Sequence, residues 1–238
     1  MAGPAQASEP SGGQPILDVF FSPVAAMDSL ARRPRWVLPL ILVTAISVTF
    51  MVVGNHRGVI EGTIRSQMEN SPRMQQVPAE QREQIIEQSM RFAKPFSWVM
   101  AVAGPALIMT LASGIFLLLA HLFAAGATFR SLFAVVTHAW LPNSLNQLIA
   151  IPILLARDPE TVDFTNVVSM ANLSFLYSPT EQIKLYKLGA SLDLFSFWVI
   201  ALLTIGIARV SGIGRGAALA VTLAPWLLYV GIFRLWLG

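Results

Sequence analysis

Polar side chains that could take part in chemistry gather in one apolar stretch in the second half of the chain. They are His138, Asn143, Asn146 and Gln147. Spacings of three and four residues put the three amides on one face of a helix, and Pro142, which has no amide hydrogen, frees the carbonyl of His138 beside them. One interpretation is a polar pocket or pathway in a membrane, where a histidine can change charge near neutral pH.

The alternative is that this polar cluster is structural. Asn and Gln commonly join neighbouring helices in membranes, at about 0.6–2 kcal/mol per contact. Small residues such as Gly126, Ala134 and Ala150 would let another helix approach closely. The sequence favours this structural role, yet the cluster stays the candidate site because polar groups in hydrocarbon are costly and often functional.

Other kinds of site find little support. The chain has no cysteine, which excludes disulfides and thiolate nucleophiles. His121 and His138 without a carboxylate make a poor metal site. There is no Gly-x-Ser-x-Gly, no His-Glu-x-x-His and no phosphate-binding loop, since the glycine-rich run 211–216 links two apolar segments. We expect no catalytic, cofactor or metal site, and no enzyme.

Composition identifies the environment of the chain. Of 238 residues, 55% are hydrophobic and 12% charged, against about 25% charged in soluble proteins. Uncharged runs of about 18 or more residues can cross about 30 Å of hydrocarbon. The sequence predicts an all-α membrane protein, a five-transmembrane-helix bundle with amphipathic flanking and loop helices. The expected spans are about 36–53, 96–123, 131–156, 192–210 and 216–236.

The chain before the first span divides into two parts. Residues 1–14 are rich in Gly, Ala, Ser and Pro and predict a disordered tail. Residues 15–35 predict a juxtamembrane amphipathic segment on the membrane surface, with Ser22 as the cap and Pro23 as the first residue of a short helix. Residues 36–238 form the membrane domain.

Two long connections also carry helical patterns. In 55–95 the apolar residues recur every three or four positions, which predicts two amphipathic helices. We interpret them as a solvated cap on the outer leaflet, with a docking surface as the alternative. In 157–191, Ser178 and Glu181 form a capping-box pattern that predicts a short helix through Leu188.

Basic residues indicate the orientation. Arginines precede the first span and occupy the two short turns, and all of these positions fall on one side of the membrane. The positive-inside rule then places the N-terminus in the cytoplasm and Gly238 outside. The basic residues are scattered beside apolar segments and form no stripe, so no nucleic acid partner is expected.

The sequence resembles the bacterial branch of the Yip (Ypt-interacting protein) membrane family from Phe20 to its end. The resemblance rests on Phe-Phe-Ser-Pro at 20–23, Pro-Arg-Trp-Val-Leu-Pro at 34–39, Thr-Phe-Arg at 128–130 leading into Val-Val-Thr-His-Ala-Trp-Leu-Pro at 135–142, and Leu-Asp-Leu-Phe-Ser-Phe-Trp at 192–198. It implies five helices with a cytoplasmic N-terminus, in a bacterial inner membrane. Eukaryotic relatives are associated with Rab-type GTPases and carry Asp-Leu-Tyr-Gly-Pro, which this chain lacks, so a GTPase partner is not carried over.

We therefore expect a non-enzymatic protein that organises the membrane or binds a membrane or envelope protein. The alternative is a transporter or lipid-handling protein that uses the polar face of the third span. Self-association stays open, because the small residues that would support it are also needed within one bundle.

Overall fold

The computed structural model describes residues 14–69, 71, 74, 76–123, 126–158, 172–178 and 181–232. The expected tail, 1–14, lies outside these residues except for Gln14. The regular elements are helices, in the order α1 (Gln14–Phe21), α2 (Pro23–Arg32), α3 (Val37–His56), α4 (Val59–Glu69), α6 (Ala79–His121), α7 (Phe129–Ala139), α8 (Leu141–Ala156), η2 (Ser174–Leu176), α10 (Ile183–Ala190), α11 (Leu194–Ser211) and α12 (Arg215–Tyr229).

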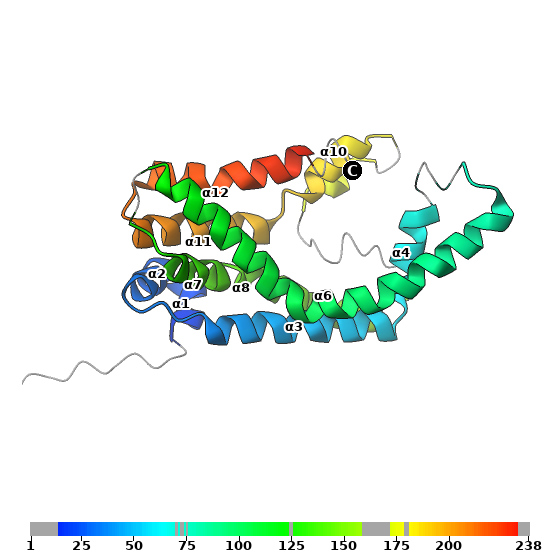
Figure 1. Cartoon of the computed structure of the whole chain (residues 1–238), viewed down its shortest axis with the longest axis horizontal. Helices are drawn as coiled ribbons and strands as arrows, with labels where there is room; N and C mark the ends of the chain where they lie inside the picture. The colour runs from blue at the N-terminus through cyan, green and yellow to red at the C-terminus, as the bar shows by residue number, and fades with distance from the viewer. Residues whose placement is uncertain are drawn as a thin grey trace, which may run out of the picture.

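Five helical segments of the described residues are long and apolar enough to cross a membrane. They are Val37–His56, Glu80–His121, Phe129–Ala156, Leu194–Ser211 and Arg215–Ile232. Because successive spans alternate in direction, α3, α7 and α12 begin, and α6 and α11 end, at one end of the bundle (Figure 1). We call this the arginine end, since it carries Arg35, Arg130, Arg209 and Arg215. The prediction of an all-α, five-span membrane protein is confirmed.

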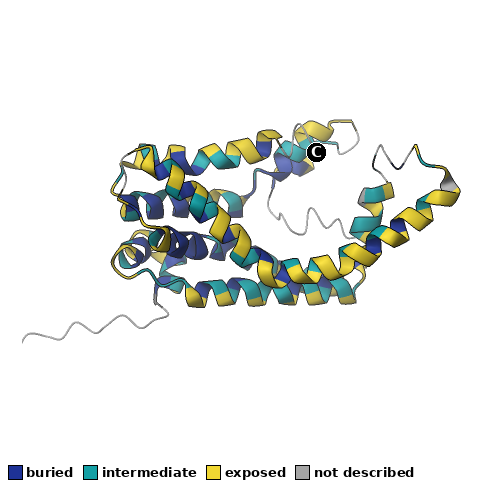
Figure 2. Cartoon of the chain, viewed as in Figure 1, coloured by how far each residue is buried: buried dark blue, intermediate teal, exposed yellow. Residues whose placement is uncertain are grey.

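The outer surface of the bundle is apolar. Large side chains such as Leu111, Leu118 and Leu227 are exposed on α6 and α12, and exposed positions run along the outer helices in Figure 2. A water-soluble protein rarely exposes so large a continuous apolar surface, whereas lipid solvates it at no cost. This surface is what an integral membrane protein requires.

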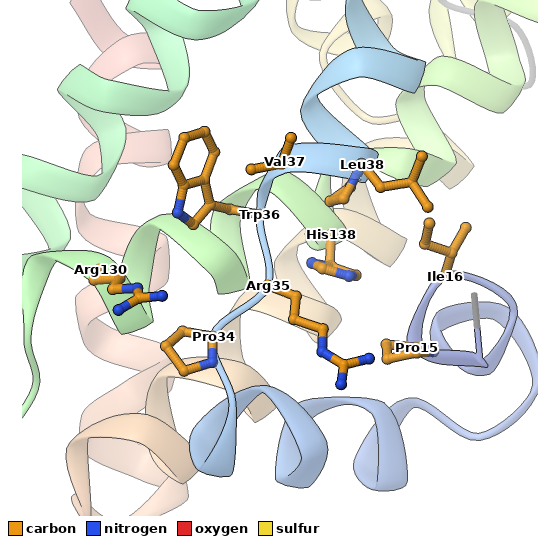
Figure 3. Close-up of a pocket in the computed structure, with 10 residues that line it drawn as sticks. Pro15, Ile16, Pro34, Arg35, Trp36, Val37, Leu38, Arg130 and His138 are labelled. Atoms are coloured by element: carbon orange, nitrogen blue, oxygen red, sulfur yellow. The ribbon is translucent and has the colours of Figure 1, made fainter. Parts of the chain in front are cut away.

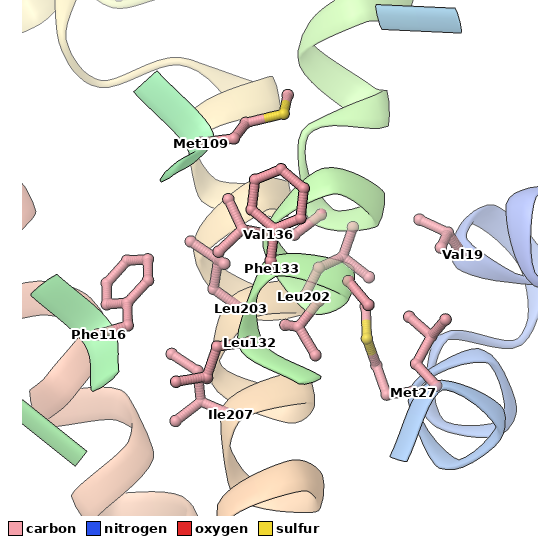
Figure 4. Close-up of a cluster of buried hydrophobic side chains, with 14 of the residues drawn as sticks. Val19, Met27, Met109, Phe116, Leu132, Phe133, Val136, Leu202, Leu203 and Ile207 are labelled. Atoms are coloured by element: carbon pink, nitrogen blue, oxygen red, sulfur yellow. The ribbon is translucent and has the colours of Figure 1, made fainter. Parts of the chain in front are cut away.

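The core is centred on α7. Every residue from Leu132 to Ala139 is buried, and the side chains of α7 pack between α6, α11 and the N-terminal helices (Figure 4). Gly206 of α11 allows the closest approach, because a Cβ at this position would lie 2.3 Å from Val135 Cγ1 and 2.9 Å from Met27 Sδ. Three elements therefore meet at a point where a larger residue does not fit.

The N-terminal helices belong to this core. Helix α2 begins at Pro23 as predicted, although the side chain of Ser22 makes no capping hydrogen bond. Met27 is fully buried against the bundle, and Asp28 pairs with Arg209 at 3.2 Å. The apolar face of α2 thus contacts α11 and α7, while a position of this segment on the membrane surface stays a prediction.

Helix α6 is longer than the sequence indicated. The pattern in 55–95 predicts two amphipathic loop helices. The first is α4. The second does not form a separate helix, because it continues into the second span as one helix of 43 residues. Pro95 and Pro105 lie inside it. A proline removes one backbone hydrogen bond and bends a helix without necessarily ending it, and α6 is visibly bent in Figure 1.

The third span has a local irregularity. It crosses as one helical segment, Phe129–Ala156, and a single residue, Trp140, separates α7 from α8 with a backbone of φ −82° and ψ −11°. Pro142 follows in the first turn of α8, where its missing N–H is tolerated. Because Pro142 has no N–H to donate to the carbonyl of His138, the span can bend at this point.

The second long connection is partly described. The Glu181 amide donates to Ser178 Oγ at 3.2 Å, as a capping box requires, but the helix that follows, α10, begins only at Ile183; residues 179 and 180 lie outside the described part. Asp193 caps α11 by accepting hydrogen bonds from the amides of Phe195 and Ser196, each at 3.0 Å. A structural role explains this buried carboxylate.

Candidate functional site

The structure separates the polar cluster of the third span into two environments. His138 lies near the end of α7 and is 1% exposed, with Nδ1 2.8 Å from the carbonyl oxygen of Ala134. Asn143, Asn146 and Gln147 lie on α8; the second is buried and the other two are half-buried. Of the four, only His138 lines the cavity described below.

Asn146 lies on the side of α8 that packs against α3. Ala150 and Leu154, four and eight residues further along the same helix face, form a small apolar cluster with Phe50 of α3 and Val59 of α4. Amides in such a position can join helices, which is the structural interpretation of the cluster. A pathway role for these amides stays a prediction.

His138 instead lines a cavity of about 390 Å³ at the arginine end (Figure 3). The lining comes from the start of α1, the connection between α2 and α3, the first turn of α3, and α7. It consists of Pro15, Ile16, Pro34, Arg35, Trp36, Val37, Leu38, Pro39, Arg130 and His138. We call this cavity the basic pocket, because Arg35 and Arg130 are its charged residues.

Local sequence explains how the connection between α2 and α3 forms one wall of the basic pocket. Arg33 has an extended backbone, with φ −138° and ψ 93°, as expected of a residue before proline. Pro34 thus ends α2, and the chain passes Arg35 before α3 starts at Val37. The ring of Trp36 packs edge-on against Phe133 of α7, with centroids 5.3 Å apart, so the start of α3 is fixed against the core.

The opposite wall is fixed by the first turn of α7. Thr128 and Ser131 form a reciprocal capping box, in which each side chain accepts a hydrogen bond from the other residue's amide. Such a cap stabilises a helix end by about 1 kcal/mol. Arg130 lies within this capped turn, and its place on the rim of the basic pocket follows from it.

The two arginines of the basic pocket have no partner among the described residues. Neither Arg35 nor Arg130 forms an ion pair or a side-chain hydrogen bond with any residue that the structure describes. Arg209, at the same end of the bundle, pairs with Asp28. The pocket therefore presents two uncompensated guanidinium groups, one half-buried and one exposed.

His138 adds a polar atom at the inner end of the basic pocket. Because Nδ1 lies at hydrogen-bond distance from the Ala134 carbonyl oxygen, Nδ1 must carry the hydrogen, and Nε2 is the nitrogen left for another partner. Figure 3 shows the imidazole beside the Arg35 side chain. Two cations, an imidazole and apolar walls suit an anionic group attached to an apolar body.

The described residues offer little support for metal ligation or for general acid–base catalysis. In the part of the chain that the structure describes, no three His, Asp or Glu side chains are grouped so as to hold a metal ion. His121 is exposed at the end of α6, with Nδ1 2.7 Å from the carbonyl oxygen of Leu117. The basic pocket is lined by no carboxylate that could exchange a proton with His138.

In the sequence, Arg35 and Arg130 indicate only the orientation of the chain, and neither is predicted as a site residue. The available signal was the position of each arginine at a helix start, beside a tryptophan and a capping threonine respectively. What the sequence could not supply was their proximity, because 94 intervening residues separate them.

The family model described as the Yip1 domain matches residues 17–237. No curated protein and no solved structure gives a significant match to the chain.

Proposed function

The chain belongs to the Yip1 family and is an integral membrane protein, and from this premise we propose that it is a non-enzymatic protein that organises a partner protein at a bacterial cytoplasmic membrane. In this proposal the N-terminus is cytoplasmic and the partner is a membrane or envelope protein. The supporting observation is a helical projection that extends past the bundle at the end opposite the arginine end. We call it the arm (Figure 1); it consists of α4, the described residues between α4 and α6, and residues 79–94 of α6.

The arm has a small apolar core of its own. Met74, Ile86 and Met90 are buried there, and Ile64, Met68 and Val77 pack around them. Gly58, with φ +72°, lets the chain reverse between α3 and α4. A left-handed backbone of this kind suits glycine. The arm is therefore an ordered unit rather than a loose connection.

Ion pairs connect the two helices of the arm. Arg65 on α4 contacts both carboxylate oxygens of Glu83 on α6 at 3.0 Å, and the hydrogen bond and charge of Glu83 raise the pKa of Arg65. Lys94 and Glu61 pair at 2.8 Å. Exposed pairs of this kind add little stability, and they join α4 to α6 beside the apolar contacts of the arm.

The arm also offers a polar face for a partner. Gln84, Glu87, Gln88 and Arg91 are exposed along α6, in contrast to the apolar surface further along the same helix. An ordered, polar and charged face outside the lipid is suited to binding a protein. The interpretation of this region as a solvated cap needs no partner. A direct test for a partner therefore distinguishes a solvated cap from a binding surface.

A photo-crosslinking residue placed singly at Gln84, Glu87 or Gln88 tests this proposal in intact membranes. We expect one adduct of defined mass at these positions and none at the control position Leu118, which is exposed on the lipid-facing part of α6. Ile86→Asn, which puts an amide into the arm core, should remove the adduct while the bundle stays folded. No adduct at any arm position, or the same adduct at Leu118, would count against a partner on the arm.

The orientation has its own test. A reporter fused after Gly238 should report the outside of the cytoplasmic membrane, because five spans follow a cytoplasmic N-terminus. A cytoplasmic signal would reverse the topology and would put the arm in the cytoplasm.

The alternative function, a transporter or lipid-handling protein, draws support from the break between α7 and α8. Transporters use interrupted helices near the middle of the membrane to expose backbone groups. Since the chain has no cysteine, single cysteines at Asn143, Asn146 and Gln147 can be probed with a water-soluble maleimide. Labelling would support a hydrated pathway, and complete protection would leave the amides a structural role.

A further inference from the structure

We propose that the basic pocket binds the phosphate headgroup of an anionic phospholipid from the leaflet at the arginine end. This inference does not depend on the arm or its partner. It rests on the juxtaposition of two unpaired arginines, a tryptophan and the lipid-facing start of α3 around one cavity.

The charge of the basic pocket favours an anion. Arg35 and Arg130 line the same cavity without an acidic partner among the described residues, so the charge of the cavity is positive and attracts an anion. A guanidinium offers planar, paired donors that match two phosphate oxygens. Phosphate is the anion that these two residues are best suited to hold.

The apolar wall of the basic pocket favours a lipid as the source of that phosphate. Val37 and Leu38 line the pocket and are also about half exposed on the outside of α3. Ile41, one turn further along α3, is exposed as well. The wall of the pocket thus continues into the lipid-facing surface, so an acyl chain can follow α3 while its headgroup lies between the arginines.

The position of the basic pocket matches the depth of a headgroup. Trp36 lies at the start of the first span, and tryptophan is enriched where hydrocarbon meets water. Basic pockets between membrane helices are suited to anionic lipid headgroups. The volume of about 390 Å³ falls within the range of about 300–1,000 Å³ typical of small-molecule sites.

His138 gives the basic pocket a polar inner end. Since Nδ1 is held by the Ala134 carbonyl oxygen, Nε2 is the atom available to a phosphate oxygen or to a glycerol hydroxyl. The side chain is 1% exposed, so close packing restricts the orientation of the ring. A headgroup with a hydroxyl therefore fits better than a bulky choline.

The test uses the full chain in detergent micelles and measures bound lipid by native mass spectrometry. Phosphatidylglycerol and phosphatidylcholine with the same acyl chains are added in turn. We expect retention of phosphatidylglycerol in preference to phosphatidylcholine. Arg35→Gln and Arg130→Gln should each weaken phosphatidylglycerol binding about fivefold, the contribution expected of one arginine at an anionic membrane surface.

Arg215→Gln is the matched control. It removes one exposed arginine at the same end of the bundle but outside the basic pocket, so phosphatidylglycerol binding should be unchanged. Equal retention of the two lipids by the unmodified protein would overturn the proposal. So would an equal loss in Arg215→Gln, since binding would then reflect general charge.

Inorganic phosphate and glycerol 3-phosphate distinguish the two possible sources of the phosphate. For a lipid site, millimolar concentrations of either should leave phosphatidylglycerol bound. Displacement by either one would overturn the assignment to a lipid and would identify a site for a soluble phosphate compound.

A measurement without arginine variants covers the case in which those variants fail to fold. Phosphatidylglycerol with brominated acyl chains should quench the fluorescence of Trp36, obtained as the difference between the unmodified protein and Trp36→Phe, more than brominated phosphatidylcholine does at the same mole fraction. Equal quenching by the two lipids would contradict the proposal. The lipid tests change no residue of the arm. The crosslinking experiment on the arm therefore tests the partner independently of lipid binding.

Discussion

The α7-centred core and the arm both bury apolar side chains, yet they are held together by different means. In the core, eight successive residues of α7 are buried, and helices approach so closely that Gly206 leaves no room for a methyl group. In the arm, three buried residues are supplemented by exposed ion pairs. Dense packing fixes the core in one arrangement, whereas the arm can open without disturbing the bundle.

The largest expected difference between the two regions comes from removing one buried side chain in each. Leu132→Ala in the core should destabilise the whole protein by about 2–5 kcal/mol, because the cavity it leaves cannot collapse. Ile86→Ala in the arm, at a residue that is 2% exposed, should leave the melting temperature of the bundle nearly unchanged. It should instead speed hydrogen–deuterium exchange in α4.

Thermal melting in detergent and exchange mass spectrometry measure the two effects side by side. If Ile86→Ala lowered the melting temperature as much as Leu132→Ala, the arm and the core would be one cooperative unit, and the distinction between them would fail.

A smaller effect is expected from Gly206→Ala. Its new methyl group would overlap Val135 and Met27, and overpacking of this kind typically costs about 1–3 kcal/mol. Gly216→Ala in α12 is the matched control, because a Cβ there meets nothing within 4 Å and alanine favours a helix by about 0.5–1 kcal/mol over glycine. A fall in melting temperature for the first and none for the second would show that close packing governs the core.

The smallest effect is expected from Glu83→Gln. It removes the ionic partner of Arg65 on α4, and because the pair is exposed the change in overall stability should be too small to detect by melting. Exchange in α4 should become faster and less sensitive to salt, since screening no longer weakens an ion pair. Unaltered exchange would mean that apolar contacts alone hold the arm.

The five spans could be predicted from the sequence because uncharged runs of sufficient length have few alternatives to crossing a membrane. The predicted starts of the first and fourth spans, residues 36 and 192, lie within two residues of Val37 and Leu194, where α3 and α11 begin. The continuity of α6 could not be predicted, since whether Pro95 ends or only bends a helix depends on the packing around it.

The candidate site was predictable only in part. His138 was recognised from its type and position, whereas its proximity to Arg35 and Arg130 arises from the packing of α1, the connection between α2 and α3, and α7. No local pattern encodes contacts over such sequence separations. The separation of His138 from Asn143 and Gln147 is different, because positions five and nine residues apart lie on different sides of a helix.

One consequence of the shape of α6 concerns mechanical force. Its backbone is continuous from the arm to the arginine end over about 64 Å, at 1.5 Å per residue, but Pro95 and Pro105 each leave one hydrogen bond unmade. A helix bends more easily at such points than elsewhere. We expect a pull on the arm to bend α6 at Pro95 before it disturbs the α7 core.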